Sequence, residues 1–73
     1  MYNYTKLHGR IVECYRTQHR FAREIGLTPR SISLKLNNVV GWKQSEIAKA
    51  AKLLDLSNNE IGVYFFTRVK TEN

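Results

Sequence analysis

The chain has 73 residues, the length of one small domain, and a domain of this size has little room for a large cofactor beside its own core. Its composition, with 42% hydrophobic and 25% charged residues, is typical of a globular fold and argues against a disordered chain, and no stretch approaches the roughly 18 consecutive apolar residues expected of a membrane span. The net charge of +6 comes entirely from residues 1–43, where eight Lys and Arg stand against two Glu, and this asymmetry favours nucleic acid as a partner.

The first predicted helix covers residues 5–15, because apolar residues recur there at helical spacing while charged residues fill the opposite side. Its apolar positions are Leu7, Ile11, Val12 and Tyr15. Cys14, the only cysteine, stands at the end of this pattern, so we expect an inert thiol in the core or at its boundary. A single cysteine forms no disulfide within the chain and suits a reducing compartment.

The second predicted helix covers residues 18–25. Thr17 is a suitable N-cap, since a threonine hydroxyl accepts a hydrogen bond from a free backbone N–H of the first helical turn. Gly26 follows the helix directly, at the place where a residue of positive φ often ends a helix. The inward-facing residues of this helix are predicted to be Phe21, Ala22 and Ile25.

The third predicted helix follows almost at once, over residues 28–37. Thr28 is its expected N-cap, and Pro29 takes the first helical position, where a missing N–H has no consequence. The helix is expected to end at Asn37 and Asn38, because asparagine tolerates the left-handed backbone conformation.

The second half of the chain predicts two more helices, over residues 44–54 and 58–65. Ser57 and Glu60 form a capping box before the latter, in which each side chain satisfies a backbone donor of the other residue. Residues 66–70 are rich in β-forming side chains and are compatible with a short strand, a fraying helix end or a dimer contact. We therefore predict one all-α domain over residues 1–73, a five-helix bundle that has room for a short C-terminal strand.

Residues 18–37 carry the pattern of a helix-turn-helix. This motif needs a small residue where two helices touch, a glycine at the turn, apolar residues after the turn, and an apolar face on the first helix. All four occur at the required spacing. Ala22 is the small residue, Gly26 is at the turn, Leu27 and Ile32 follow the turn, and Phe21 and Ile25 form the apolar face. Two short helices that cross steeply leave one face of the second helix free to enter the major groove of DNA.

The same segment resembles the lambda-type Cro and CI repressor family, whose pattern is matched by Gln18, Phe21-Ala22, Gly26-Leu27, Ile32-Ser33 and Leu36-Asn37. The resemblance extends over residues 6–66 and looks closest to small regulators from the lysogeny modules of phages that infect Gram-positive bacteria. Among these it is similar to the Cro-like modulator-of-repression proteins. The resemblance implies a Cro/CI-like helical fold and a role in the switch between lysis and lysogeny.

The resemblance also implies which residues meet a partner. Gln18 would bind a phosphate near a helix N-terminus. Arg30 would hold guanine O6 and N7 through two hydrogen bonds, a contact worth about 1–3 kcal/mol of base discrimination. The full predicted contact set is Gln18, Thr28, Pro29, Arg30, Ser31, Ser33, Leu34, Lys35, Asn37, Asn38 and Lys43.

Pro29 and Leu34 depart from the family pattern, which often has a polar residue at both positions. Compared with a polar residue, each of them has a side chain that forms no hydrogen bonds and adds apolar surface, which suits a protein partner better than DNA. Alternatively, Leu34 is simply buried beside Leu36.

Two functions therefore stand open from the sequence. The first is a transcriptional regulator that binds double-stranded operator DNA, as a homodimer on a two-fold site. The second is an antirepressor that binds the cognate CI-type repressor protein and alters its binding to DNA. A protein that coats nucleic acid is disfavoured, because the tyrosines are too scattered to form a row of stacking side chains.

The sequence indicates no enzyme, since it has no paired-carboxylate or Ser-His-Asp pattern and no glycine-rich phosphate loop. His8 and His19 lack a second ligand at metal-binding spacing, so we expect neither a metal nor another cofactor. Trp42 is expected to cover the edge of the core. The chain shows no signal-peptide pattern, and the expected location is the cytoplasm of the bacterial host.

Overall fold

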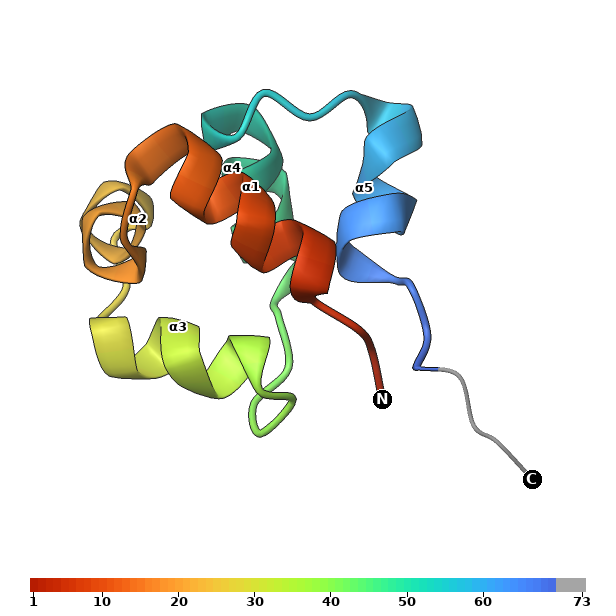
Figure 1. Ribbon diagram of the computed structural model, residues 1–73, viewed down its shortest axis with the longest axis horizontal. Helices are drawn as coiled ribbons and strands as arrows, with labels where there is room; N and C mark the ends of the chain where they lie inside the picture. Colours follow the sequence, from red (N-terminus) through yellow and green to blue (C-terminus); the bar gives the residue numbers. More distant parts are fainter. Residues whose placement is uncertain (70–73) are drawn as a thin grey trace.

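The computed structural model describes residues 1–69, and this part of the chain folds into five helices (Figure 1). They are α1 (Thr5–Tyr15), α2 (Gln18–Ile25), α3 (Pro29–Leu36), α4 (Gln44–Leu53) and α5 (Asn58–Phe65). The predicted all-α class is confirmed, and both ends of every helix lie within one residue of the predicted positions. None of these helices is long and apolar enough to cross a bilayer.

Local hydrogen bonds at the helix ends explain why the predicted boundaries hold. The hydroxyl of Thr17 accepts a backbone N–H of α2 over 3.2 Å, and the hydroxyl of Thr28 does the same for α3 over 3.1 Å. Gly26 turns the chain between these helices with a φ of 81°. The carboxylate of Glu60 accepts the N–H of Ser57 over 2.9 Å, as the capping box predicts.

All five helical regions contribute to one core. The largest fully buried side chains are Leu7, Ile11, Phe21, Ile32, Leu54 and Phe65. Each such side chain stabilises the fold by roughly 1.5–3 kcal/mol through removal of apolar surface from water. Ile32 is the fully buried residue of α3, so this helix is fixed to the bundle along a narrow stripe and keeps its other sides outside.

Two residues of α1 lie outside the core, in contrast to the sequence-based expectation. Val12 is 42% exposed, because one helical step of about 100° takes it off the stripe through Leu7 and Ile11. Cys14 is exposed as well, and Tyr15 packs against the core at this end of α1.

The two terminal segments lie side by side and pair through an isolated antiparallel bridge between Tyr2 and Arg68. The N–H of Asn3 donates to the carbonyl of Thr67 over 2.6 Å on one side of the bridge. Of the predicted segment, Phe66 thus still ends α5, Arg68 forms the isolated bridge, and Lys70 lies outside the described residues.

Candidate interaction surface

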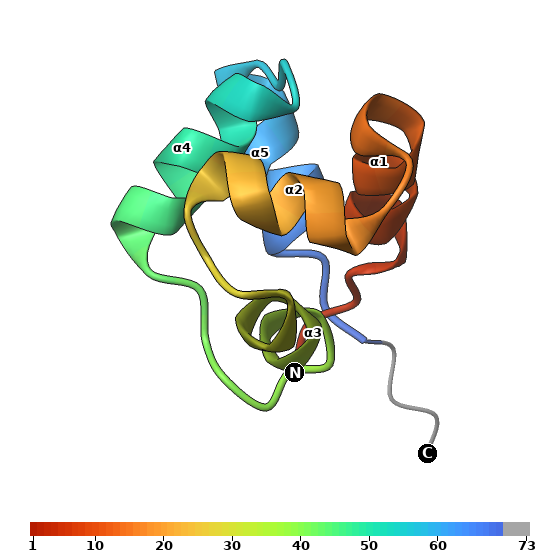
Figure 2. The ribbon, with the colours of Figure 1, turned by 90° about the vertical axis from the view of Figure 1, so that its left-hand side faces the viewer.

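Helix α3 lies at one edge of the bundle and packs mainly on α2. Figure 2 looks along α3 and shows that no other helix covers its lower side. Most of the predicted contact residues lie on the uncovered side. We define the α3 surface as the exposed Thr28, Pro29, Arg30, Ser33 and Asn37, together with the half-buried Leu34. The partial exposure of Leu34 leaves apolar surface available there.

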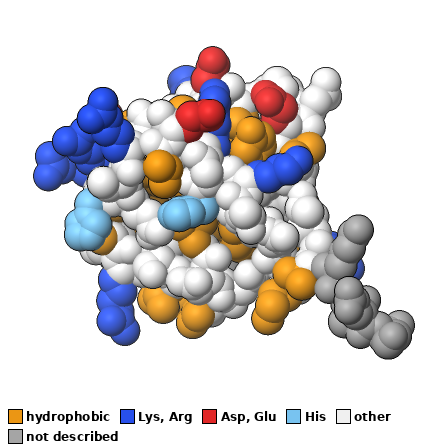
Figure 3. Space-filling view, in the orientation of Figure 1, with side chains coloured by type: hydrophobic (Ala, Val, Ile, Leu, Met, Phe, Trp, Pro, Cys, Tyr) orange, Lys and Arg blue, Asp and Glu red, His pale blue; other side chains and the backbone are white. Residues whose placement is uncertain are grey.

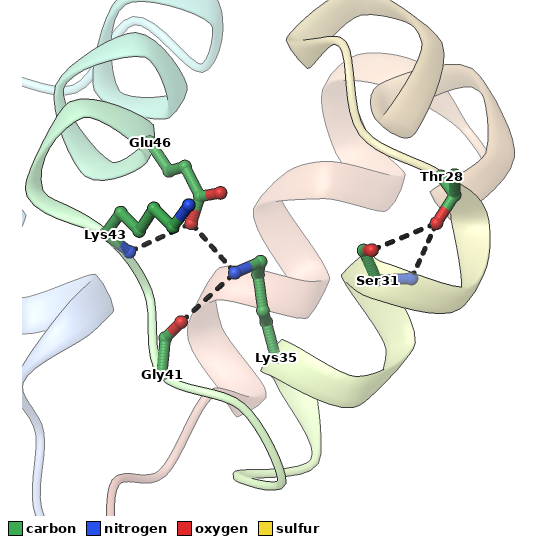
Figure 4. Close-up of polar contacts among 6 residues, drawn as sticks. All are labelled: Thr28, Ser31, Lys35, Gly41, Lys43 and Glu46. Carbon is green, nitrogen blue, oxygen red and sulfur yellow. Dashed lines mark hydrogen bonds and ion pairs between the residues drawn. The ribbon is translucent and has the colours of Figure 1, made fainter.

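The polar groups that begin α3 are partly engaged with one another. The hydroxyl of Thr28 accepts the backbone N–H of Ser31, and the two hydroxyls lie 3.0 Å apart (Figure 4). Ser31 is half-buried, so the start of α3 offers Pro29 and Arg30 as its most accessible side chains. Because the cap holds the first turn in place, these two side chains are presented from a fixed backbone.

Lys35 lies inside the molecule and is therefore removed from the predicted contact set. It is 4% exposed, and its ammonium lies 2.9 Å from the carboxylate of Glu46 and 3.1 Å from the carbonyl of Gly41 (Figure 4). Lys35 follows the buried Ile32 by three residues, so both side chains face the bundle on the same side of α3. This spacing was the one sequence signal for its burial.

Glu46 joins α3 to the start of α4. One of its carboxylate oxygens accepts both the Lys35 ammonium and the backbone N–H of Lys43, each over 2.9 Å. Burial acts to raise the pKa of Glu46, but these hydrogen bonds and the nearby positive charges outweigh it, so the pKa lies below its usual value. The side chain of Lys43 is exposed and stays available to a partner.

Trp42 completes the junction behind α3 and covers the edge of the core, as expected. The Lys35 ammonium lies 5.9 Å from the centre of the Trp42 ring, within the range of a cation–π contact. The same ring meets that of Phe65 edge-on, with 5.2 Å between ring centres. These contacts hold the loop after α3 against the core.

The two asparagines that end α3 differ in how far they are engaged. The Asn38 side chain accepts the N–H of Tyr2 over 3.0 Å and donates to the Tyr2 carbonyl over 2.7 Å. The exposed Asn37 donates through its amide to the carbonyl of Ser33 over 2.8 Å. Asn38 therefore anchors the N-terminal segment, and Asn37 keeps its side-chain oxygen for a partner.

Gln18 is half-buried at the first position of α2 and lies apart from the first turn of α3. It borders a shallow hollow together with Leu36, Asn37 and His8. The hollow thus brings Gln18 to the C-terminal end of the α3 surface. His8 was not among the predicted contact residues, because nothing in its sequence neighbourhood indicates this proximity.

Val39 and Val40 extend the α3 surface and were missed in the sequence analysis. Their backbone N–H groups both donate to the carbonyl of Leu34, over 2.9 and 3.3 Å, which holds the loop beside the end of α3. The valines are 67% and 44% exposed. Two adjacent apolar residues after an asparagine pair were the available signal.

The charge of the α3 surface is low for a protein with a net charge of +6. Within the described residues, Arg30 is its one charged side chain, since Lys35 is engaged inside. The remaining surface consists of small polar groups and the apolar side chains of Pro29 and Leu34, extended by Val39 and Val40. Such a surface can dock apolar groups and bind one anionic group.

Comparisons with known proteins cover nearly the whole chain. A family model described as "Protein of unknown function (DUF739)" matches residues 1–68. No curated protein matches the chain. The solution structure of the modulator of repression (MOR) of the temperate bacteriophage TP901-1 from Lactococcus lactis is similar, with 46% sequence identity and a TM-score of 0.79. The match covers 94% of this chain and 95% of that one.

Proposed function

Because the chain belongs to the family described as "Protein of unknown function (DUF739)" and is a relative of a phage modulator of repression, we propose that it regulates the switch between lysis and lysogeny of a phage. It acts as an antirepressor: its α3 surface binds the cognate CI-type repressor protein and alters the binding of that repressor to DNA. The site of action is the cytoplasm of the bacterial host.

The composition of the α3 surface carries this proposal. A helix that reads DNA depends on several cationic and hydrogen-bonding side chains, which meet phosphates and base edges. Here Lys35 pairs with Glu46 inside the molecule, which leaves Arg30 as the charged residue of the surface. Leu34 and Val39 offer apolar contacts instead, and an arginine amid apolar side chains is typical of the centre of a protein interface.

A second candidate function is direct binding to operator DNA. Its support is the excess of positive charge in residues 1–43 and the exposed Arg30 near the start of α3, a helix that follows α2 through a glycine turn. In this alternative the chain would bind as a homodimer, with Gln18 and Lys43 near phosphates.

Calorimetric titration with two partners separates these functions. The partners are the cognate CI-type repressor protein, and a duplex that carries the operator of that repressor. If the chain is an antirepressor, it should form a saturable complex with the repressor protein. In the absence of repressor, it should bind the operator duplex no more tightly than a scrambled duplex. Tight binding to the operator alone, with no complex between the two proteins, would contradict it.

Two variants test whether α3 forms the contact. Leu34→Ser and Arg30→Ala should each weaken binding to the repressor by about tenfold, the effect of losing an interface anchor worth somewhat more than 1 kcal/mol. Val63→Ser is the matched control, because Val63 is 42% exposed on α5 and lies outside the α3 surface. Equal weakening by all three variants would show that the contact lies elsewhere.

A further inference from the structure

Arg16, between α1 and α2, has an unusual backbone conformation. Its φ is 70° and its ψ is −41°, and the N–H of Thr17 donates to the carbonyl of Tyr15 over 2.8 Å. The three residues thus form a γ-turn with a positive φ at its centre, the rare and strained form of this turn. An arginine at this position places its Cβ in a region that L-residues avoid.

The other positive-φ residues of the described chain are of types that accept this conformation. They are Gly26, Asn38 and Asp55. Glycine has no Cβ, and asparagine and aspartate are enriched in the left-handed region because of their short polar side chains. Arg16 has neither advantage, and glycine would suit its backbone better.

The side chain of Arg16 does not compensate for this strain within the chain. Arg16 is exposed, and within residues 1–69 its guanidinium takes part in no hydrogen bond or ion pair, unlike that of Arg10, which binds both Glu13 and the carbonyl of Leu54. A strained backbone that persists without an internal benefit points to a role for the side chain in binding a partner.

Two further arginines follow Arg16 in the chain, on α2. Arg20 and Arg23 are both exposed on α2, and Figure 3 shows Lys and Arg side chains gathered at the upper left, over α2 and the turn before it. Arg20 and Arg23 border a shallow hollow that Tyr15 and Glu24 also line. The hydroxyl of Tyr15 donates to the carbonyl of Leu53 over 3.2 Å, so its ring is held in place in this hollow.

We propose that Arg16, Arg20 and Arg23, together with the Tyr15 that lines the hollow beside Arg20 and Arg23, form a second docking surface, for an acidic segment of a protein partner. Guanidinium groups bind carboxylates through paired hydrogen bonds, and arginine and tyrosine are the side chains enriched where protein interfaces are strongest. This surface lies over α2 and the turn before it, away from the uncovered side of α3 (Figures 1 and 3). The inference does not depend on which partner binds α3.

The carboxylate of Glu24 favours a protein over DNA at this surface. It lines the same hollow, where it repels a row of phosphates but can pair with a cation that a protein segment carries among its acidic residues.

Nuclear magnetic resonance titration of the complete, ¹⁵N-labelled chain tests the proposal with two probes: a short peptide of alternating Glu and Ser with one central Lys, and a random-sequence duplex of equal net charge. The peptide should shift the amide signals of Tyr15, Arg16, Arg20 and Arg23 and leave those of Arg30 to Leu36 in place. Peptide-induced shifts confined to α3, or tighter binding of the duplex at the arginines, would overturn the proposal.

Arg16→Gly gives the decisive variant, because it separates binding from folding. It should raise the Tm by relieving the positive φ, and should weaken peptide binding by about threefold, the effect of one exposed ion pair. Lys6→Gln is the matched control, since Lys6 is an exposed cation on α1 outside this surface, and it should leave the affinity unchanged. A Tm that does not rise, or equal weakening by the control, would contradict the role of Arg16.

Discussion

Lys35 of α3 and Glu46 of α4 are joined by an ion pair of 2.9 Å between side chains that are 5% and 13% exposed. The pair fixes α3 to α4 and removes a lysine from the surface that α3 presents. The same contact therefore contributes both to the position of α3 and to the low charge of the α3 surface.

Removing one partner of this pair should destabilise the fold. Lys35→Met leaves the Glu46 carboxylate in the interior without its counter-ion, and we expect the free energy of unfolding to fall by about 3 kcal/mol. The double variant Lys35→Met with Glu46→Leu should recover most of this loss, because an apolar pair of similar volume often replaces a buried ion pair without cost. Urea unfolding followed by circular dichroism measures both. A single variant as stable as the wild type would show that the pair contributes little.

Stability should decrease in acid, with Glu46 as a main cause. The pKa of Glu46 in the folded chain is lower than its ordinary value of 4.5, so the unfolded chain takes up the proton first as the pH falls. The stabilisation by Glu46 is thus complete at pH values above its ordinary pKa. It is lost as the pH drops through the lower pKa that Glu46 has in the folded chain. Thermal melts from neutral pH into the acid range should show a falling Tm, and Glu46→Gln should flatten this dependence. An equal slope in the variant would assign the effect to other carboxylates, such as Glu60, whose pKa is lowered by the backbone N–H of Ser57.

Asn38 should tolerate glycine better than alanine. Both substitutions remove the two hydrogen bonds to the backbone of Tyr2, which we expect to cost about 1–2 kcal/mol. Asn38 has a φ of 62°, and alanine in this conformation should cost about 1 kcal/mol more than glycine. Chemical unfolding ranks the two variants, and hydrogen exchange should show faster exchange of the Tyr2 amide in both. An alanine variant more stable than the glycine variant would mean that this backbone conformation is not kept.

The helices were predictable from the sequence because their ends depend on local chemistry. Thr17, Thr28 and Gly26 each act on backbone groups within a few residues, so a single segment of sequence contains the whole interaction. The same holds for the predicted exposure of Pro29 and Arg30, which follows from helical periodicity around the buried Ile32.

The rest of the candidate site depends on contacts between distant parts of the chain. Lys35 was expected on the surface, since its partner Glu46 belongs to another helix and no local pattern joins them. The position of Val39 depends on the loop that Asn38 ties to Tyr2, across 36 residues of sequence. Arg16 carried no signal, because arginine is not a residue that predicts a positive φ.

The most direct test of the proposed antirepressor function is a competition between this chain and operator DNA for the repressor, measured by fluorescence anisotropy. The repressor is first bound to its labelled operator duplex, and the chain is then added in increasing amounts. We predict that the wild-type chain changes the anisotropy in a saturable way that reports altered binding of the repressor to DNA, and that Leu34→Ser at equal concentration has little effect. An unchanged repressor–operator complex at saturating wild-type chain, or an equal effect of the Leu34→Ser variant, would contradict the proposed role of the α3 surface.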